Sequence, residues 1–203
     1  NSQTDKTISL SKYDDYVIYD LTIICDSGGR ADDFVYFIPI ANNNTSLNEI
    51  ILDNNASFVM SEAATVYNSI SSNGVKVYYT NKKDLTYNDA LVLTDWFEEL
   101  PSDVTWSDIT MIKIVSAEEY ISNGSESLVS LKLKYSKTEE EFISEAGMKA
   151  TWNSRGYYNY TIGTRMISGH FSTSLNTISL TYTMPVQEIT LTAAKDRNPS
   201  GSA

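Results

Sequence analysis

The heptapeptide VSLKLKY at residues 129–135 has the clearest period-two pattern in the chain. Valine, leucine and tyrosine occupy every second position, and serine and lysine occupy the positions between them. Successive side chains of a β-strand point to opposite faces of a sheet, so this pattern predicts a strand with one buried and one solvated face. The buried face needs a second layer to cover it.

Similar strand signals occur on both sides of this heptapeptide. They lie at residues 16–25, 34–40, 75–79, 109–115, 177–183 and 186–192. Turn signals separate several of them, at 26–29, 72–74 and 122–124, and the last two contain the Asn-Gly pair that favours tight reversals. The sequence therefore predicts an all-β fold, an Ig-like or adhesin-type antiparallel β-sandwich. Pro39 predicts that the strand at 34–40 ends at a sheet edge or a bulge.

Only one segment has a helical signature. Thr138 and Glu141 have the spacing of a capping box, Phe142 and Ile143 supply a short apolar stripe, and Gly147 can end the helix. The prediction is at most one short helix, about two turns long, in an otherwise β fold.

The length favours one folded unit, over residues 1–194, followed by a polar linker or tail at 195–203. The alternative is a sandwich over 1–137 with a smaller β unit over 138–194. The chain starts at Asn1 rather than Met and shows no signal peptide or anchor, so we interpret it as a piece of a longer protein.

The composition restricts the chemistry. Fifteen lysines and arginines against 26 acidic residues give a net charge of −11, which repels phosphate backbones and disfavours nucleic acids and anionic membranes as partners. The chain has one His, one Cys and nine Gly, which predicts no enzymatic activity, no metal site and no cofactor. No apolar run approaches the ~18 residues of a membrane span, so no membrane insertion is expected.

Two single residues could carry chemistry. Cys25 lies on the same side of its predicted strand as the apolar residues, which predicts a buried, inert thiol. His170 lies in a loop-like stretch and is interpreted as a surface or hydrogen-bonding residue.

Two stretches are candidate binding sites. Aromatic residues are concentrated at Trp152, Tyr157, Tyr158 and Tyr160, where a carbohydrate or a protein could bind, although core and sheet packing is the alternative explanation. The turn at residues 26–33 comes nearest to a calcium loop, but it lacks the alternating oxygen donors, and a solvated turn is favoured.

Five segments, taken in order, carry a family resemblance. They are the strand VIYDLTI and turn DSGG within 17–29, the strand DFVYFIPI at 33–40, the strand VKVYYT at 75–80, the Trp96 and Trp106 region with Ile112–Ile114, and Asn123-Gly124-Ser125 with the strand at 128–133. This succession is similar to the β-sandwich repeat or adhesion domains of cell-wall-anchored surface proteins of Gram-positive bacteria (Firmicutes). The resemblance covers residues 16–190.

The resemblance implies a non-enzymatic stalk or adhesion module, located outside the cell and anchored to the cell wall through another part of the protein. The implied partners are neighbouring domains of the same surface protein and a host protein or glycan. Some such modules carry a Lys–Asn isopeptide bond, for which Lys6 and Lys12 are the candidate lysines, with solvated surface lysines as the alternative. A carbohydrate-binding module of a secreted enzyme is the second functional hypothesis, because it shares the scaffold and the aromatic residues.

Overall fold

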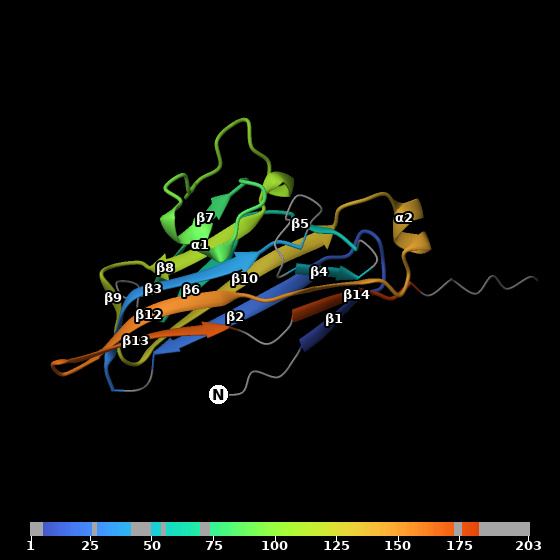
Figure 1. The fold of residues 1–203 in the computed structure, drawn as a ribbon. Coiled ribbons are helices and arrows are strands. Elements are labelled where there is room, and N and C mark those ends of the chain that lie inside the picture. The colour runs from blue at the N-terminus through green and yellow to red at the C-terminus, as the bar shows by residue number, and fades with distance from the viewer. Residues whose placement is uncertain are drawn as a thin grey trace, which may run out of the picture.

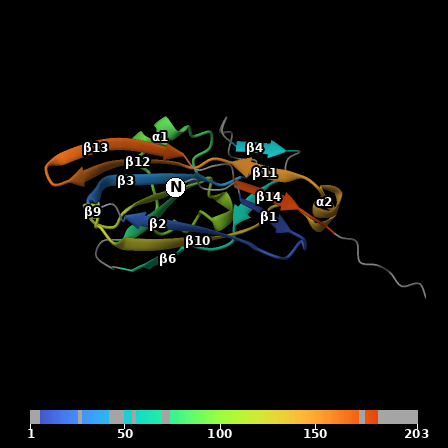
Figure 2. The same cartoon turned by 90° about the horizontal axis from the view of Figure 1, so that it is seen from below.

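The computed structural model describes residues 6–25, 28–41, 50–53, 56–69, 74–172 and 176–182. Two β-sheets face each other across the core, and a third, smaller sheet extends from one end (Figures 1 and 2). The predicted all-β sandwich is confirmed. The predicted strand at 186–192 and the tail at 195–203 lie outside the described residues.

The larger layer is a six-stranded antiparallel sheet. Its strands are β3 (Arg30–Pro39), β7 (Val75–Thr80), β8 (Met111–Ser116), β9 (Tyr120–Ile121), β12 (Arg155–Ile162) and β13 (Arg165–Ser172). The order across the sheet is β13-β12-β3-β8-β7, and β9 pairs with the start of β3. The second layer contains β2 (Val17–Cys25), β5 (Phe58–Met60), β6 (Thr65–Asn68) and β10 (Ser125–Tyr135).

The heptapeptide at 129–135 lies in β10, at the centre of the second layer, where β10 pairs with β2, β5 and β6. Its four apolar residues are buried, and the intervening serine and lysines are partly or fully exposed, as the alternation predicts. β2 shows the same pattern, and Cys25 at its end is 8% exposed, in agreement with the predicted core thiol. The apolar sides of β2, β10 and β3 form the main core.

The third sheet consists of β1 (Lys6–Leu10), β4 (Ile50–Asp53), β11 (Lys149–Trp152) and β14 (Asn176–Leu180), in the order β1-β14-β11-β4. β1 runs parallel to β14, which departs from the purely antiparallel pairing that was predicted. Parallel neighbours need a long connection, and here the two strands come from opposite ends of the chain. β12 comes after residue 137 in the chain and β3 comes before it, and the two strands pair with each other. The segments before and after residue 137 thus share sheets.

The described residues form two short α-helices, where one was expected. The predicted helix is α2 (Glu139–Ser144), in which Thr138 caps Glu141 and Phe142 is buried. The helix that was missed is α1 (Tyr87–Val92), which follows Thr86 and begins with a capping box closed by Asp89. A single 3₁₀ turn, η1 (Trp106–Asp108), has the same arrangement with Thr105 and Asp108. Asp replaces the usual Glu in both boxes, and only two residues of α1 are buried, so the apolar stripe that signals a helix is absent.

Two positional predictions need correction. Pro39 is the last residue of β3, but β3 is a central strand rather than an edge strand. Pro39 lies beyond the end of the pairing with β12, which stops at Phe37, and its pairing with Met111 is the last one with β8. A residue at the end of both ladders can lack an N–H group, so the proline is tolerated there. His170 lies in β13 opposite Tyr157, and not in a loop.

Candidate functional site

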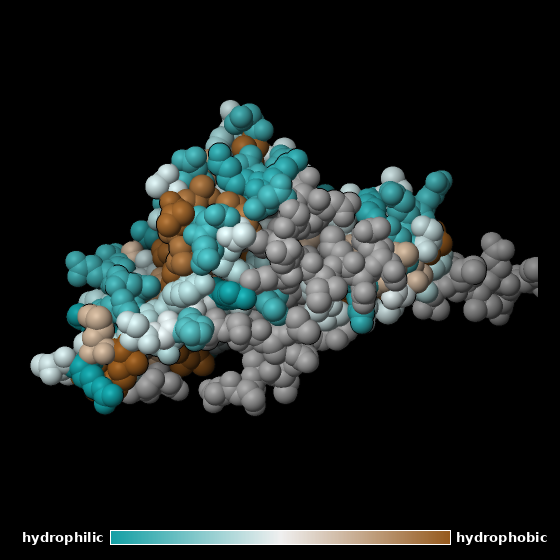
Figure 3. Space-filling view, in the orientation of Figure 1, coloured by the Kyte–Doolittle hydropathy of each residue, from teal (hydrophilic) through white to brown (hydrophobic). Residues whose placement is uncertain are grey.

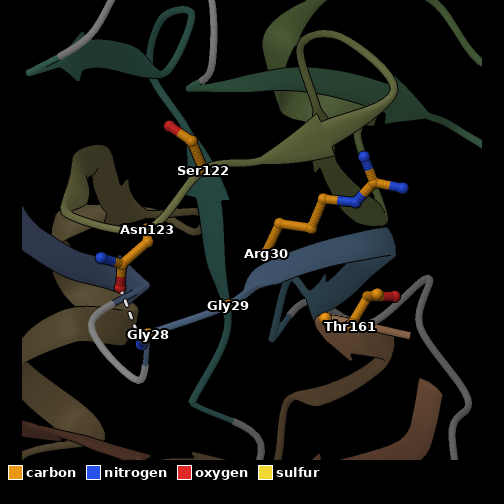
Figure 4. Close-up of a pocket in the computed structure, with 7 residues that line it drawn as sticks. Gly28, Gly29, Arg30, Ser122, Asn123 and Thr161 are labelled. Atoms are coloured by element: carbon orange, nitrogen blue, oxygen red, sulfur yellow. Dashed lines mark hydrogen bonds between the residues drawn. The ribbon is translucent and has the colours of Figure 1, made fainter. Parts of the chain in front are cut away.

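Three turns meet at the end of the sandwich opposite the third sheet (Figures 1 and 4). They connect β2 to β3, β9 to β10, and β12 to β13. Together they line a shallow pocket of about 460 Å³, formed by Gly28, Gly29, Arg30, Ser122, Asn123, Thr161 and Gly163. Turns gathered at one end of a sandwich are a common place for recognition, because the scaffold holds them and they tolerate variation.

Hydrogen bonds between the turns hold the main chain of this pocket. The Gly28 N–H donates to the Oδ1 atom of Asn123 over 2.9 Å, and the Gly29 N–H donates to the Tyr160 hydroxyl over 2.7 Å. A Cβ atom on Gly29 would lie 2.4 Å from the carbonyl oxygen of Thr161, so only glycine fits at this position. The β2–β3 turn is therefore tied to the β9–β10 turn and to the end of β12 before any ligand arrives.

Arg30 is the one charged residue among the described residues that line the pocket, and its side chain is fixed in two ways. Its Nε donates to Oδ1 of Asp32 over 2.9 Å, and its guanidinium group lies 4.8 Å from the centroid of the Tyr120 ring. The second Asp32 oxygen accepts from the Thr161 hydroxyl over 2.5 Å. Figure 4 shows Asn123 reaching toward Gly28 while Arg30 extends to the other side of Gly29. The pocket is thus lined by an amide, two hydroxyls and a guanidinium group, each of which already makes a bond within the protein: Asn123 to Gly28, Ser122 to Ser125, and Thr161 and Arg30 to Asp32.

The tyrosines predicted as a binding surface do not share one face. Tyr157 packs against the small cluster formed with Phe37 and Tyr87, beneath α1. Tyr158 and Tyr160 point to the opposite face and pack on the main core. Because side chains alternate along a strand, three tyrosines so close in sequence could not all point to the same side. Trp152 belongs to β11, and its side chain lies outside the description.

Both core-facing tyrosines cover a glycine. The Tyr158 ring lies over Gly169 on β13, where an added Cβ atom would approach the ring to 2.6 Å. The Tyr160 ring lies over Gly29, whose N–H bonds to its hydroxyl group. An aromatic ring beside a strand glycine fills the space that a side chain would occupy. Tyr160 therefore connects the aromatic stretch, found from the sequence, to the end pocket, which the sequence did not reveal.

The remaining sequence candidates are widely separated. Lys6 opens β1, and its side chain lies outside the description; Lys12 is exposed in the turn after β1. His170 is exposed on β13. Within the described ranges, no group of three or more His, Cys, Asp or Glu residues is placed to hold a metal ion. No helix in that part of the chain is long and apolar enough to cross a membrane.

A second pocket, of about 410 Å³, lies beside the turn after β1 and includes Tyr13, Lys134, Tyr135 and Lys137. Here the Tyr135 hydroxyl donates to Glu145 over 2.6 Å, and Lys137 forms an ion pair with the other oxygen of the same carboxylate over 2.5 Å. Burial, and then the bond to Glu145, raise the pKa of Tyr135. These contacts hold the end of α2 against β10, which explains them without a ligand.

A partly buried lysine lies on the outer face of the larger sheet. The ammonium group of Lys113 is 4.5 Å from the Trp96 ring centroid and 5.4 Å from that of Tyr78. Burial lowers the pKa of this lysine. The sequence shows Lys113 as an interruption of an apolar strand, but its aromatic neighbours come from distant segments and could not be predicted.

The chain matches no protein-family model, and no curated protein is significantly similar to it in sequence.

Proposed function

We propose that this chain is a non-enzymatic β-sandwich module of a bacterial surface protein and that it binds a host ligand through the end pocket. One observation carries the proposal: hydrogen bonds tie the β2–β3 turn to the β9–β10 turn and to Tyr160 near the end of β12, around a pocket of polar groups. A site built in advance loses little conformational entropy on binding. The confirmed sandwich and the order of the five sequence segments support the wider assignment to an extracellular, cell-wall-anchored protein.

The lining also favours a second function, that of a carbohydrate-binding module of a secreted enzyme. Amide, hydroxyl and guanidinium groups hydrogen-bond well to sugar hydroxyls, and the rings of Tyr120 and Tyr160 lie beside the pocket. A glycan ligand together with a hydrolase domain in the parent polypeptide would favour this function. A protein ligand together with a sortase signal would favour the adhesion module.

The test is a binding screen of the purified chain against a glycan array and extracellular-matrix proteins. We expect a saturable ligand whose affinity falls about tenfold in Arg30→Ala, because a guanidinium that contacts a ligand contributes about 1.4 kcal/mol or more. Lys83→Ala, which removes an exposed cation far from the pocket, is the matched control and should bind normally. Absence of saturable binding, or equal binding by Arg30→Ala, would contradict the proposed site.

A further inference from the structure

The charges of the chain are strongly segregated. Residues 146–187 contain no Asp or Glu, although about five would be expected at the average frequency of the chain. They contain three cations, Lys149, Arg155 and Arg165, whereas the other 161 residues carry all 26 acidic residues against 12 lysines and arginines. This acid-free stretch includes the whole of the β12–β13 hairpin.

The hairpin forms one edge of the larger sheet. β12 and β13 pair in continuous register around a two-residue turn, in which Gly163 has φ +58°. Among the described residues, β13 pairs with β12 alone. An exposed edge strand of eight residues is a template for another strand, and proteins usually block it with proline, lysine or a bulge. β13 contains neither proline nor lysine, and its register with β12 has no bulge.

The two-residue turn of the hairpin determines which main-chain groups of β13 point away from β12. The residues that flank a two-residue hairpin turn, Ile162 and Arg165, form a hydrogen-bonded pair, and such pairs alternate along an antiparallel ladder. The N–H groups of Met166, Ser168 and His170 therefore point to the free edge. Met166 is 63% exposed and Ile167 is 41% exposed. Figure 3 shows hydrophobic residues near the free end of this hairpin, at the lower left.

The electrostatic surroundings favour an acidic partner. Arg165 is exposed and has no ion pair among the described residues. Among the described residues, the carboxylates nearest along the sheet are those of Asp32 and Asp33 on β3, two strands or about 10 Å from β13. Asp32 bonds to Arg30 and Thr161, and Asp33 accepts from the Asn159 amide. A second copy of β13 would bring no carboxylate to Arg165, and two chains of charge −11 repel one another.

We propose that the free edge of β13 is a docking site for an extended, acidic polypeptide segment that adds to the sheet as a further strand. The partner's main chain would bond to the outward groups of Met166, Ser168 and His170, and a carboxylate would lie opposite Arg165. Main-chain bonds provide the affinity in such strand addition, and side chains provide the selectivity. This surface is the outer edge of the hairpin whose turn borders the end pocket, and the proposal does not depend on the function proposed for that pocket.

The test uses two labelled heptapeptides, one alternating glutamate with valine and one alternating lysine with valine, in fluorescence anisotropy titrations with the full chain. We expect saturable binding of the glutamate peptide, about tenfold tighter than that of the lysine peptide and weaker at high salt. Arg165→Glu should reverse this preference. Arg30→Ala should not change it, so that failure of the pocket and failure of this edge can be told apart.

Ser168→Pro removes one outward N–H and should abolish binding, whereas Ser168→Ala keeps the N–H and should bind normally. If the proline variant does not fold, amide exchange in the unaltered chain replaces it, and the peptide should protect Met166, Ser168 and His170. The proposal would be overturned by no saturable binding, by equal binding of both peptides, by retained binding in a folded Ser168→Pro, or by no protection of these amides. Self-association of the peptide-free chain that Ser168→Pro abolishes would identify a second copy as the occupant and would also overturn it.

Discussion

At one edge of the larger sheet, the outward main-chain groups of Val75 and Tyr79 in β7 bond to other parts of the chain, whereas at the opposite edge β13 pairs only with β12 among the described residues. The Asn68 side chain accepts from the Val75 N–H and donates to the Val75 carbonyl oxygen. The main chain of Phe97 exchanges two bonds of 2.8 Å with Tyr79. β7 is therefore closed by its own chain at Val75, where the strand begins, and at Tyr79, next to its end.

The two edges also differ in charge. The segment 81–109, which supplies Phe97, contains seven acidic residues and two lysines, whereas 146–187 contains three cations and no acid. An edge covered by an acidic segment of its own chain disfavours another strand, and an edge strand whose own charged residue is Arg165 favours an acidic one. The difference shows that a single sheet can have one protected edge and one available edge.

The largest expected effect is a loss of unfolding free energy when proline is introduced at the closed edge, compared with proline at the edge formed by β13. Phe97→Pro removes the N–H that donates to Tyr79 and should cost about 3 kcal/mol, because the buried carbonyl group loses its partner. Ser168→Pro should cost less than about 1 kcal/mol, because its N–H faces solvent. Urea unfolding measures both, with Phe97→Leu as the side-chain control. Equal costs at the two sites would contradict the comparison.

A smaller loss is expected when the amide that closes β7 is removed. Asn68→Ala leaves the N–H and the carbonyl group of buried Val75 without their partner and should lower the free energy of unfolding by about 2 kcal/mol. Asn123→Ala is the matched control, because its amide caps the exposed Gly28 N–H, and it should cost no more than about 1 kcal/mol. A cost for Asn68→Ala as small as that of the control would show that water replaces the amide.

The hairpin at the open edge depends on the contact between Tyr158 and Gly169. Gly169→Val places a Cβ atom against the ring and should destabilise the fold by about 1 to 2 kcal/mol, although valine favours strands. Ser168→Val, at the neighbouring exposed position, should have an effect within about 0.5 kcal/mol. In a double-mutant cycle the valine should cost less when Tyr158 is alanine, and an unchanged cost would refute the steric explanation.

The smallest expected effect is a local response to acid. Bonds from the Thr86 hydroxyl and N–H lower the pKa of Asp89, and those from Thr105 lower the pKa of Asp108. A carboxyl group with a lowered pKa in the folded state stabilises the fold above its unfolded pKa, and this contribution is lost as pH falls through the folded pKa. Below about pH 4, the amide protection factor of Phe97 should therefore decline before those of the β12–β13 hairpin.

Asp89→Asn combined with Asp108→Asn is the control for this titration, because these amides do not ionise. The variant should have less protection at Phe97 at neutral pH and little further loss in acid. A parallel loss of protection at both edges in the unaltered chain would mean that acid acts on the whole fold rather than on the segment that closes β7.

Local pattern was a sufficient guide to β2, β3, β7, β8 and β10 and to α2. It did not predict β5, β6, β9, or the β12–β13 hairpin, whose residues were interpreted as an aromatic stretch and a loop. The alternation at 129–135 matches the burial observed in β10, because one face of this strand packs on the core and the other faces solvent. The capping box at Thr138 also formed as predicted, because its bonds span only three residues. By contrast, α1 has too few apolar residues to be recognised, and the parallel pairing of β1 with β14 joins segments about 170 residues apart.

The sequence by itself determined the all-β class, the buried faces of β2 and β10, the burial of Cys25 and the charge of each segment, because these depend on neighbouring residues and on composition. Only the tertiary structure decided that Asn123 and Tyr160 bond to the β2–β3 turn and that Asn68 and Phe97 close one sheet edge while β13 remains at the other. The physical reason is that each of these contacts joins main-chain groups to residues from another part of the chain. Their positions follow from how the sheets pack, and no local pattern encodes that packing.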